Sequence, residues 1–327
     1  MINIDVLDSF AGKTALITGG TGLIGRQITR ILINAGAIVR IVSLDKNKVH
    51  DKAEHIVGDL SDFNFCKLIT RDIDFVFHIA GVKGSVKVTK EKPASFFVPL
   101  LMMNTNMLES ARINNVKKLV YTSSVGAYSS AEIFVEGENE DGPPMDEFPG
   151  LAKRVAEQQI LAYKIQYGLD NYAIVRPANI YGPGDNFDPE NAMVIPTLMH
   201  RILNKEDPVI IWGDGSAIRD FAYSKDVAEG IVLALYYGTR SKYVNLGSGI
   251  GYSIKELVET LRSFIDFNYV FDSTKPSGFP KRIMNINLAR ATLGYNPTTT
   301  LKEGLMETWD WFTNNPTDYC DKKNYFN

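Results

Sequence analysis

Three glycines near the start of the chain have the spacing of a phosphate-binding turn. Gly19, Gly22 and Gly25 follow an apolar run and precede an amphipathic stretch, in the order strand, turn, helix. Glycine at such positions permits a tight turn, close approach of the backbone to a pyrophosphate, and close contact between helix and strand. The helix N-terminus adds oriented N–H groups for the anion. The motif predicts a bound dinucleotide, and its other members are Thr21, Leu23 and Ile24.

The next apolar run ends in residues that bear on the kind of dinucleotide. An acid at this position bonds the 2′-hydroxyl of the adenosine ribose and favours NAD over NADP. Asp45 can serve as that acid, although Ser43 stands where the acid is often found. Lys46 or Lys48 could instead meet the 2′-phosphate of NADP. Both cofactors stay open, with a slight preference for NAD.

Alternating apolar and amphipathic segments must position these residues. Short runs rich in Ile, Val, Phe and Tyr predict five strands, at Thr14–Thr18, Ile38–Val42, Phe75–Ile79, Lys118–Thr122 and Tyr172–Arg176. Helical patterns lie between them, for example at Arg26–Ala35 and Met102–Asn114. Such alternation is typical of βαβ units, with strands buried on both faces. We predict an α/β fold with a Rossmann-type, doubly wound parallel sheet.

After Pro177 the chain becomes richer in turns. A helix at Asp226–Tyr236 and a strand at Tyr243–Leu246 predict a return to the main sheet. We therefore expect an NAD(P)-binding domain at 1–177, with returns near 224–248. Residues 178–223 and 249–327 are expected to form a smaller, discontinuous domain that binds the substrate.

The composition argues against several classes of protein. A net charge of −3 provides no basic field for nucleic acid or an anionic membrane. Two cysteines and four scattered histidines predict neither a disulfide framework nor a metal site. No apolar run approaches the roughly 20 residues that span a bilayer, and the first twelve residues do not resemble a signal peptide. We expect a cytoplasmic enzyme or binding protein, with no metal, nucleic-acid or membrane partner.

Further motifs along nearly the whole chain resemble the extended short-chain dehydrogenase/reductase family, the NAD(P)-dependent epimerases and dehydratases of nucleotide sugars. Besides the glycine turn, they are Gly58-Asp-Leu, His78-Ile-Ala-Gly81, Tyr121-Thr-Ser-Ser124, Lys153, Arg176-Pro-Ala-Asn-Ile-Tyr-Gly182, Arg219-Asp-Phe and Asp226-Val-Ala. Within the family the chain most resembles the GDP-L-fucose synthases, in the stretches 82–85, 184–196 and 275–282.

The resemblance implies a catalytic Ser, Tyr and Lys. Ser124 matches the Ser that orients the sugar oxygen, and Lys153 matches the Lys that binds the nicotinamide ribose and lowers the pKa of the Tyr. The Tyr itself is missing, because Pro149 stands four residues before Lys153. Tyr128 is the candidate for a relocated acid. Asp146 and Glu147, just before the helix of Lys153, are expected to cap that helix or to border the sugar.

The resemblance also implies the remaining binding residues. On the cofactor side they are Asp59, Leu60, Ala80, Lys153 and Pro177. On the substrate side they are Lys83, Ser124, Asn179, Asn191, Val194, Trp212, Arg219 and Arg282. The two arginines offer paired hydrogen bonds to a diphosphate, and Trp212 offers a surface for a base or ribose. The resemblance implies a nucleotide sugar as the substrate, with a GDP-linked sugar favoured.

The same resemblance implies a homodimer formed through a four-helix bundle, with helices at Met102–Asn114 and Leu151–Gln166. Two functions are compatible with the residues. One is an NAD(P)-dependent epimerase, reductase or dehydratase that transfers hydride at a ring carbon. The alternative is a catalytically silent protein that binds a nucleotide sugar or a dinucleotide.

The missing groups predict a negative result in one assay. Making GDP-L-fucose from the 4-keto-6-deoxy sugar requires two epimerisations and a reduction, each with proton transfer. Pro149, Gly126 and Met193 stand where the resembling enzymes carry the Tyr, Cys and His for these steps. One general acid or base is worth about 10²–10⁴-fold in rate. Given that substrate and NADPH, the protein should make no GDP-L-fucose at an enzymatic rate, and a turnover of about 1 s⁻¹ or more would refute this.

Overall fold

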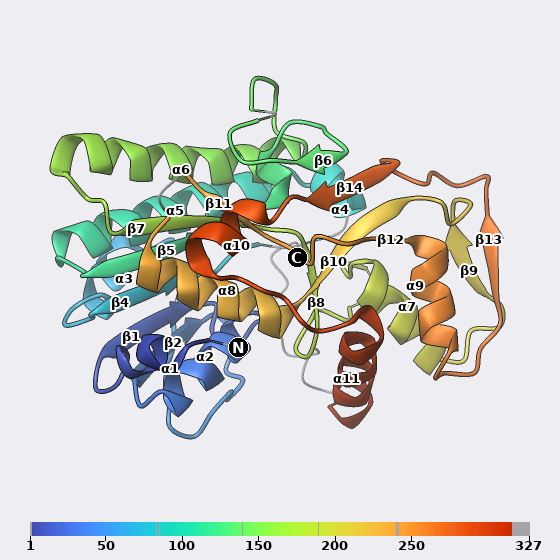
Figure 1. The fold of residues 1–327 in the computed structure, drawn as a ribbon, viewed down its shortest axis with the longest axis horizontal. Coiled ribbons are helices and arrows are strands. Elements are labelled where there is room, and N and C mark those ends of the chain that lie inside the picture. The colour runs from blue at the N-terminus through green and yellow to red at the C-terminus, as the bar shows by residue number, and fades with distance from the viewer. Residues whose placement is uncertain are drawn as a thin grey trace.

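The computed structural model describes residues 2–82, 84, 86–138, 140–188, 190–239 and 242–315 (Figure 1). In this part of the chain the largest sheet has seven strands, and every neighbouring pair is parallel. Across the sheet they are β11 (Val244–Leu246), β7 (Tyr172–Pro177), β5 (Lys118–Thr122), β4 (Phe75–His78), β1 (Thr14–Thr18), β2 (Ile38–Ser43) and β3 (Glu54–Val57). The strand order reverses between β1 and β4. In open α/β sheets, ligands bind at the carboxyl ends of the strands beside such a reversal.

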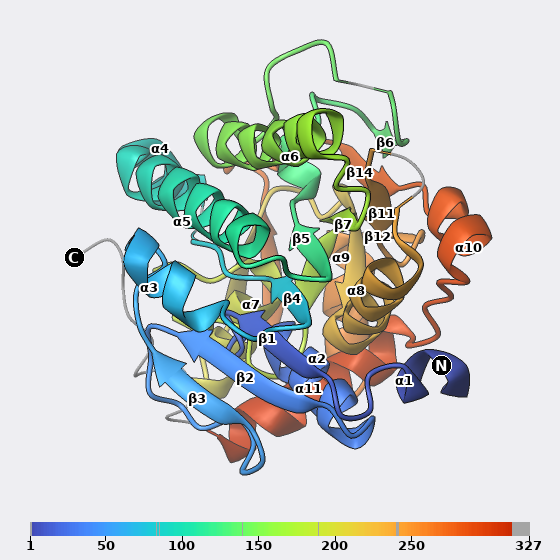
Figure 2. The same ribbon diagram turned by 90° about the vertical axis from the view of Figure 1, so that its left-hand side faces the viewer.

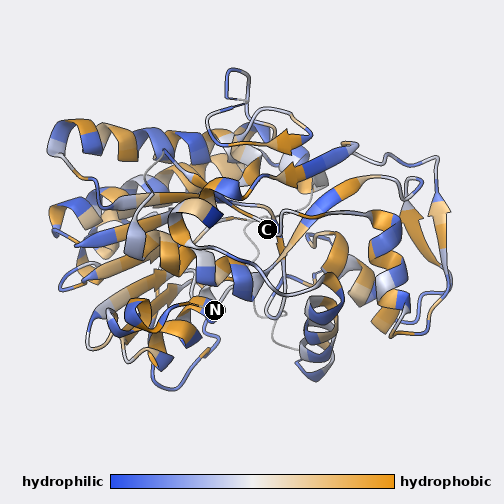
Figure 3. Cartoon of the chain, in the orientation of Figure 1, coloured by the Kyte–Doolittle hydropathy of each residue, from blue (hydrophilic) through white to orange (hydrophobic). Residues whose placement is uncertain are grey.

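Helices cover both faces of this sheet (Figure 2). One face carries α2 (Gly25–Asn34) and α8 (Ser224–Tyr237), with α10 (Asn287–Leu293) packed on α8. The other carries α3 (Phe63–Ile69), α5 (Ala94–Ile113) and α6 (Glu147–Tyr167). The central strands are therefore buried on both sides, and they are coloured mostly hydrophobic in Figure 3. The predicted doubly wound α/β fold is confirmed. Two short helices, α1 (Ile4–Asp8) and α4 (Val86–Glu91), complete this part.

Two further sheets lie toward the right of Figure 1. One contains β12 (Gly251–Ser253), β10 (Ile218–Tyr223), β14 (Lys281–Met284) and β6 (Ile133–Phe134), and β8 (Asn179–Tyr181) also pairs with β10. The other pairs β13 (Tyr269–Asp272) with β9 (Val209–Trp212). The accompanying helices are α7 (Val194–Leu203), α9 (Ile254–Arg262) and α11 (Leu301–Asn314). A second hydrophobic cluster fills this part.

The predicted strands agree with the observed ones to within a residue or two, whereas helices α5, α6 and α8 are longer than predicted. Helix α5 begins at Ala94 rather than Met102 and contains Pro99, a residue whose type favours a helix boundary. The segment 284–295 was expected in the second domain, yet its buried residues join the larger hydrophobic cluster. The domain boundaries themselves stay a prediction. Among the described residues, no helix is long and apolar enough to cross a bilayer.

A buried ion pair ties α6 to the sheet beneath it. Arg176, on β7, donates from Nε and Nη2 to the two carboxylate oxygens of Glu157, over 2.9 and 2.6 Å. The side chains of both residues are 1% exposed. Ser123 Oγ donates to the same carboxylate over 2.5 Å. The pair thus joins β5, β7 and α6 at the ends of the strands.

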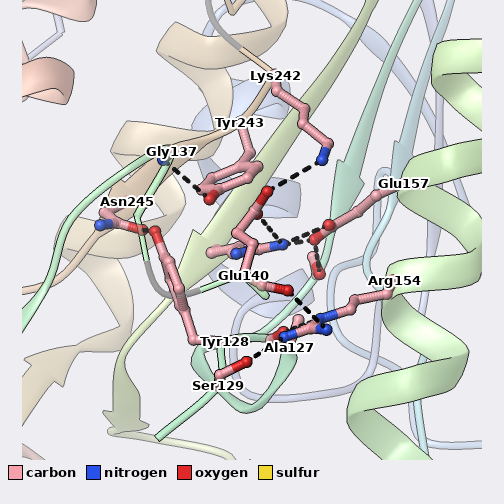
Figure 4. Close-up of polar contacts among 12 residues, drawn as sticks. Ala127, Tyr128, Ser129, Gly137, Glu140, Arg154, Glu157, Lys242, Tyr243 and Asn245 are labelled. Atoms are coloured by element: carbon pink, nitrogen blue, oxygen red, sulfur yellow. Dashed lines mark hydrogen bonds and ion pairs between the residues drawn. The ribbon is translucent and has the colours of Figure 1, made fainter. Parts of the chain in front are cut away.

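Aromatic rings enclose the guanidinium of Arg176. Its central carbon lies 3.6 Å from the ring centroid of Tyr243 and 4.3 Å from that of Tyr128. The carboxylate of Glu140 lies 3.1 Å from Nη2, and Lys242 pairs with Glu140 (Figure 4). The charge is therefore paired and sandwiched, as a buried charge must be to be tolerated.

Removing one partner of this pair should be costly. Glu157→Ala would leave the Arg176 guanidinium buried beside only one carboxylate, so the free energy of unfolding should fall by about 3–5 kcal/mol. The control is Glu54→Ala, which breaks the more exposed pair with Arg40 and should cost about 0.2–1 kcal/mol. Urea unfolding of the two variants measures both values. Equal losses would contradict the structural importance given to the buried pair.

Candidate active site

The three glycines of the turn differ in their surroundings. Two are tightly packed, and one borders open space. Gly19 has a φ of 68°, and a Cβ there would lie 3.0 Å from the Cα of Ala80. A Cβ on Gly25 would lie 2.3 Å from the carbonyl oxygen of Gly19. At Gly22, by contrast, the nearest neighbour would be the oxygen of Gly19 at 3.3 Å. Gly22 therefore borders open space beside the N-terminus of α2, which no side chain caps. These residues fit a dinucleotide pyrophosphate.

The predicted ribose-binding acid is held against this turn. Thr21 Oγ1 donates to Asp45 Oδ2 over 2.8 Å, which fixes the carboxylate beside the glycines. Ser43 turns away from the ribose position, because its hydroxyl donates to the Asp45 carbonyl and also contacts His55. Lys48 pairs with Asp51 over 2.8 Å, and Lys46 is exposed. The arrangement places Asp45, rather than Ser43, next to the turn.

A buried polar chain supports the loop after β4. Thr18 Oγ1 accepts hydrogen bonds from the amides of Ile79 and Ala80 and contacts His78 Nδ1 at 2.8 Å. His78 Nε2 lies 3.0 Å from the side-chain oxygen of Asn104. Burial lowers the pKa of His78 to about 3, helped by the charge of Lys153, so the imidazole is neutral. The chain therefore fixes the backbone around Ala80 without adding charge.

Of the other predicted cofactor residues, Asp59 is exposed, and its carboxylate accepts the amide of Ser61. Leu60 is buried, and its carbonyl accepts a hydrogen bond from Asn106 on α5. Pro177 is buried at the end of β7. Leu23 and Ile24 are half-buried at the start of α2. All of these residues lie at or just after the carboxyl ends of the parallel strands, as does the glycine turn.

Ser124 and Lys153 meet at the end of β5. Lys153 Nζ donates to the carbonyl of Thr122 over 2.7 Å and lies 5.2 Å from the ring centroid of Tyr121. Burial lowers the pKa of the Lys153 ammonium to about 8, against the favourable charge of Glu157. Ser124 Oγ accepts the amide of Gly126 over 3.0 Å, which leaves its proton available to a ligand. The hydroxyl of Ser124 and the ammonium of Lys153 are thus both positioned at the end of β5.

The candidate relocated acid, Tyr128, is held elsewhere. Its side chain is fully buried, and its hydroxyl donates to the side-chain oxygen of Asn245 over 2.9 Å (Figure 4). Burial raises the pKa of the Tyr128 phenol well above its usual value. The ring stacks on Arg176, which favours a structural role for this residue over a catalytic one. Pro149 lies in the first turn of α6 and offers no group that exchanges a proton.

Two arginines form a cationic pair across neighbouring strands. Arg219 on β10 and Arg282 on β14 are direct partners in the parallel register. Burial and the charge of Arg282 lower the pKa of Arg219 to about 10. Arg219 donates to the backbone carbonyls of Ile218 and Phe279, and neither arginine has an ion pair within the described residues. Two adjacent guanidinium groups of this kind are able to bind an anion through paired hydrogen bonds.

The turn at 275–278 brings Trp212 toward this pair. A Cβ on Gly278 would lie 3.2 Å from Arg219 Nη2, and one on Gly213 would lie 3.0 Å from the Cα of Ser277. Trp212, at the end of β9, is 64% exposed. Its side chain is therefore open to solvent, next to the glycine that packs on this turn.

The remaining predicted substrate residues are dispersed around this region. Asn191 is buried, donates to Asp188 over 2.9 Å, and has a side-chain oxygen without a partner among the described residues. Asn179 is half-buried at the start of β8, and Val194 begins α7 and packs on the second hydrophobic cluster. Lys83 lies outside the described residues.

Sequence reasoning missed Asp220, the residue next to Arg219. Its buried carboxylate accepts the amides of Ser248, Gly249 and Met284, and so joins β10 to β14 and to the turn after β11. Burial raises the pKa of this carboxyl, and the hydrogen bonds oppose the shift. An acid inside an apolar strand was the available signal.

Comparison with known proteins agrees with this geometry. Residues 15–247 match the model of the "NAD dependent epimerase/dehydratase family". GDP-L-fucose synthase 1 of Arabidopsis thaliana is 34% identical over 326 residues, covering 94% of this chain and 96% of its own. A putative UDP-glucose 4-epimerase of Methanocaldococcus jannaschii is 32% identical and covers 92% and 98%. The solved UDP-glucose 4-epimerase of Thermotoga maritima, with UDP-glucose, has a TM-score of 0.83 and 29% identity, covering 93% and 99%.

The fold and the glycine turn define a dinucleotide-binding α/β protein of the epimerase type. The chain belongs to the NAD dependent epimerase/dehydratase family. Its relatives include proteins named for GDP-linked and for UDP-linked sugars, so the family is a nucleotide-sugar one while the base and the sugar are left open.

Two glycine variants should separate cofactor binding from folding. Gly22→Val should abolish binding of NAD and NADP with little change in thermal stability, because its side chain enters the open space. Gly20→Val should instead lower stability, since a Cβ there would lie 2.5 Å from the Cβ of Ile41. Calorimetric titration and thermal unfolding measure the two effects. Dinucleotide affinity like that of the wild type in Gly22→Val would exclude the assigned pyrophosphate site.

Proposed function

We propose that this protein is an NAD(P)-dependent enzyme that modifies the sugar of a nucleotide sugar, with a GDP-linked sugar as the favoured substrate. The reaction is hydride transfer at a ring carbon, of the epimerase, reductase or dehydratase type. The observation that carries the proposal is the Arg219–Arg282 pair, for which no ion pair is found among the described residues and which supports a diphosphate site. The preference for guanine rests on the sequence resemblance.

The chain's own residues divide the work of this reaction. The glycine turn and the N-terminus of α2 hold the dinucleotide, which supplies a hydride acceptor or donor when bound. Lys153, with its pKa near 8, keeps positive charge beside the nicotinamide ribose and the reacting oxygen at neutral pH. Ser124 donates to the sugar oxygen and orients it. Trp212, Asn179, Asn191 and Val194 complete the substrate side.

NAD is the favoured dinucleotide within this proposal. The carboxylate of Asp45 is fixed beside the glycine turn by Thr21, where it would accept from a ribose hydroxyl and repel a 2′-phosphate. The ion pair of Lys48 with Asp51 reduces the positive charge available to such a phosphate. Asp45→Ala should therefore shift the ratio of NAD to NADP affinity toward NADP.

The alternative is a catalytically silent protein that binds a nucleotide sugar. Pro149 in α6 and the burial of Tyr128 favour it, because both remove an acid from the site. A screen of GDP- and UDP-linked sugars with NAD or NADP separates the two functions. The enzyme should change the absorbance of the reduced nicotinamide or yield a product with a new mass or retention. Binding of the ligands without either change would establish the silent protein.

Helices α5 and α6 carry an exposed apolar face that supports the proposed homodimer. Its residues are Val98, Met102 and Ile113 on α5, and Leu151, Val155, Leu161 and Ile165 on α6. Three pairs of them, 98 and 102, 151 and 155, and 161 and 165, are four residues or about one turn apart, and the two helices pack side by side (Figure 2). Two copies of the pair would form a four-helix bundle.

Substitution of the most exposed residue of this face should dissociate the dimer. Ile165, 78% exposed, is the test position, and Ile165→Glu should place a charge in the apolar contact. Sedimentation should show a dimer for the wild type and a monomer for the variant. Ile38→Glu, on the exposed start of β2, is the control and should leave the dimer intact. A monomeric wild type would exclude the bundle.

Substitution of the first arginine should weaken every ligand that carries the diphosphate. Arg219→Ala removes a charged hydrogen-bonding group, at a cost of about 1.5–3 kcal/mol or roughly 10–100-fold in affinity. The loss should be alike for a nucleotide sugar and for GDP alone, as measured by calorimetry. Arg71→Ala, at an exposed residue after α3, is the control. Undiminished binding of the diphosphate would place its site elsewhere.

A further inference from the structure

The start of α6 brings one carboxylate against the segment that carries Ser124. A Cβ on Gly126 would lie 2.1 Å from Oδ2 of Asp146 and 2.6 Å from its Cγ. The carboxylate therefore fills the volume that a side chain at position 126 would occupy. The amide of the same Gly126 donates to Ser124 Oγ over 3.0 Å. Asp146 thus packs on the short segment that carries Ser124, the serine that faces the sugar in the proposed function.

Backbone contacts hold Asp146 in this place. Its amide donates to the carbonyl of Gly126 over 3.1 Å, and its carbonyl accepts the amide of Gly150 over 2.6 Å. Gly150 has no room for a side chain, because a Cβ there would lie 2.3 Å from the carbonyl oxygen of Gly126. The first turn of α6 consequently packs directly on the 124–126 segment. Lys153 follows Asp146 by seven residues, two helical turns later on the same face.

No hydrogen bond within the described residues holds the carboxylate of Asp146 in the fold. Asp146 precedes α6 as its N-cap residue, yet its side chain makes no capping hydrogen bond. None of the described residues donates to it. The group keeps access to solvent, although surrounding protein raises the pKa of the carboxyl above its usual range. The charge that opposes this shift is Arg282 on β14, and the neighbouring Glu147 is exposed.

We propose that Asp146 is the general acid–base group of the site, in place of a phenol. This assignment rests on the proposed function. When the sugar is oxidised, the carbinol carbon gives its hydrogen with both electrons to the nicotinamide, and the C–O bond becomes C=O. The hydroxyl proton passes to the Asp146 carboxylate. In the reverse direction the protonated carboxyl returns that proton to the carbonyl oxygen.

Ser124, Lys153 and Asp146 have three different roles in this proposal. Ser124 donates a hydrogen bond to the reacting oxygen, and Lys153 keeps positive charge close to it. Asp146 is the group of the three that can accept a proton while carrying a negative charge. Arg282, which we assign to the diphosphate, lies close enough to Asp146 to act on its charge. The carboxylate is therefore packed on Gly126, two residues from Ser124, and interacts electrostatically with Arg282.

The decisive variant is Asp146→Asn, which keeps the shape and removes the carboxyl group that accepts and returns a proton. Asp141→Asn, at an exposed aspartate in the segment before α6, is the matched control. With a sugar that the wild type converts, Asp146→Asn should lose about 10²–10⁴-fold in turnover, whereas the control stays close to the wild type. Both variants should bind GDP with the affinity of the wild type or somewhat tighter, which shows that they fold and keep the diphosphate site.

A second variant and a second measurement test the position without removing the acid. Gly126→Ala should displace the carboxylate and lower turnover while GDP binding persists. In the protein without ligands, carbon NMR of labelled aspartate should show a carboxyl that titrates above the ordinary range, and this signal should be missing from Asp146→Asn.

Each outcome decides the assignment. Turnover in Asp146→Asn within a few-fold of the wild type overturns it and leaves the proposed function standing. An Asp146 signal that titrates in the ordinary range also overturns it. If the wild type converts none of the sugars, the proposed function fails and the assignment fails with it. Loss of turnover in Asp146→Asn and Gly126→Ala with retained GDP binding establishes the assignment.

Discussion

The buried pair of Arg176 and Glu157 fixes the geometry on which the site depends. Glu157 lies one helical turn after Lys153, so anchoring its carboxylate to β7 also anchors the lysine at the end of β5. The same carboxylate accepts a hydrogen bond from the hydroxyl of Ser123, the neighbour of Ser124. A charge pair enclosed by aromatic rings tolerates little displacement, because any gap leaves a charge without compensation. The helix and the strand ends therefore behave as one rigid unit.

The charged side chains of the site form a cationic region and an anionic one. Lys153, Arg219 and Arg282 are cations shielded from solvent, and burial lowers the pKa of each. Shielded cations bind anions more strongly than exposed ones, which suits the phosphates of a dinucleotide and of a nucleotide sugar. Asp146 adds a negative charge at the sugar end. The absence of the phenol from the first turn of α6 is thus accompanied by a carboxylate one turn away.

Local patterns were sufficient to predict the main sheet and the glycine turn. Strands such as Thr14–Thr18 are buried on both faces, and because burial favours apolar side chains, their composition alone indicates that they are central strands. The position of Asp146 against Gly126 was not predictable, because it depends on how the loop before α6 packs on residues twenty positions away in sequence. The surroundings of Tyr128 were not predictable for the same reason. Its burial depends on Arg176 and Asn245, which come from distant strands.

The central claim is that one site holds a dinucleotide and a nucleoside diphosphate sugar with the sugar between Ser124 and Asp146. A crystal structure of the protein with NAD and GDP-mannose tests it most directly. The account predicts diphosphate oxygens on Arg219 and Arg282, the pyrophosphate of NAD at Gly22, and a sugar hydroxyl within hydrogen-bond distance of both Ser124 and Asp146. A diphosphate bound away from the two arginines, or a sugar out of reach of Asp146, would contradict it.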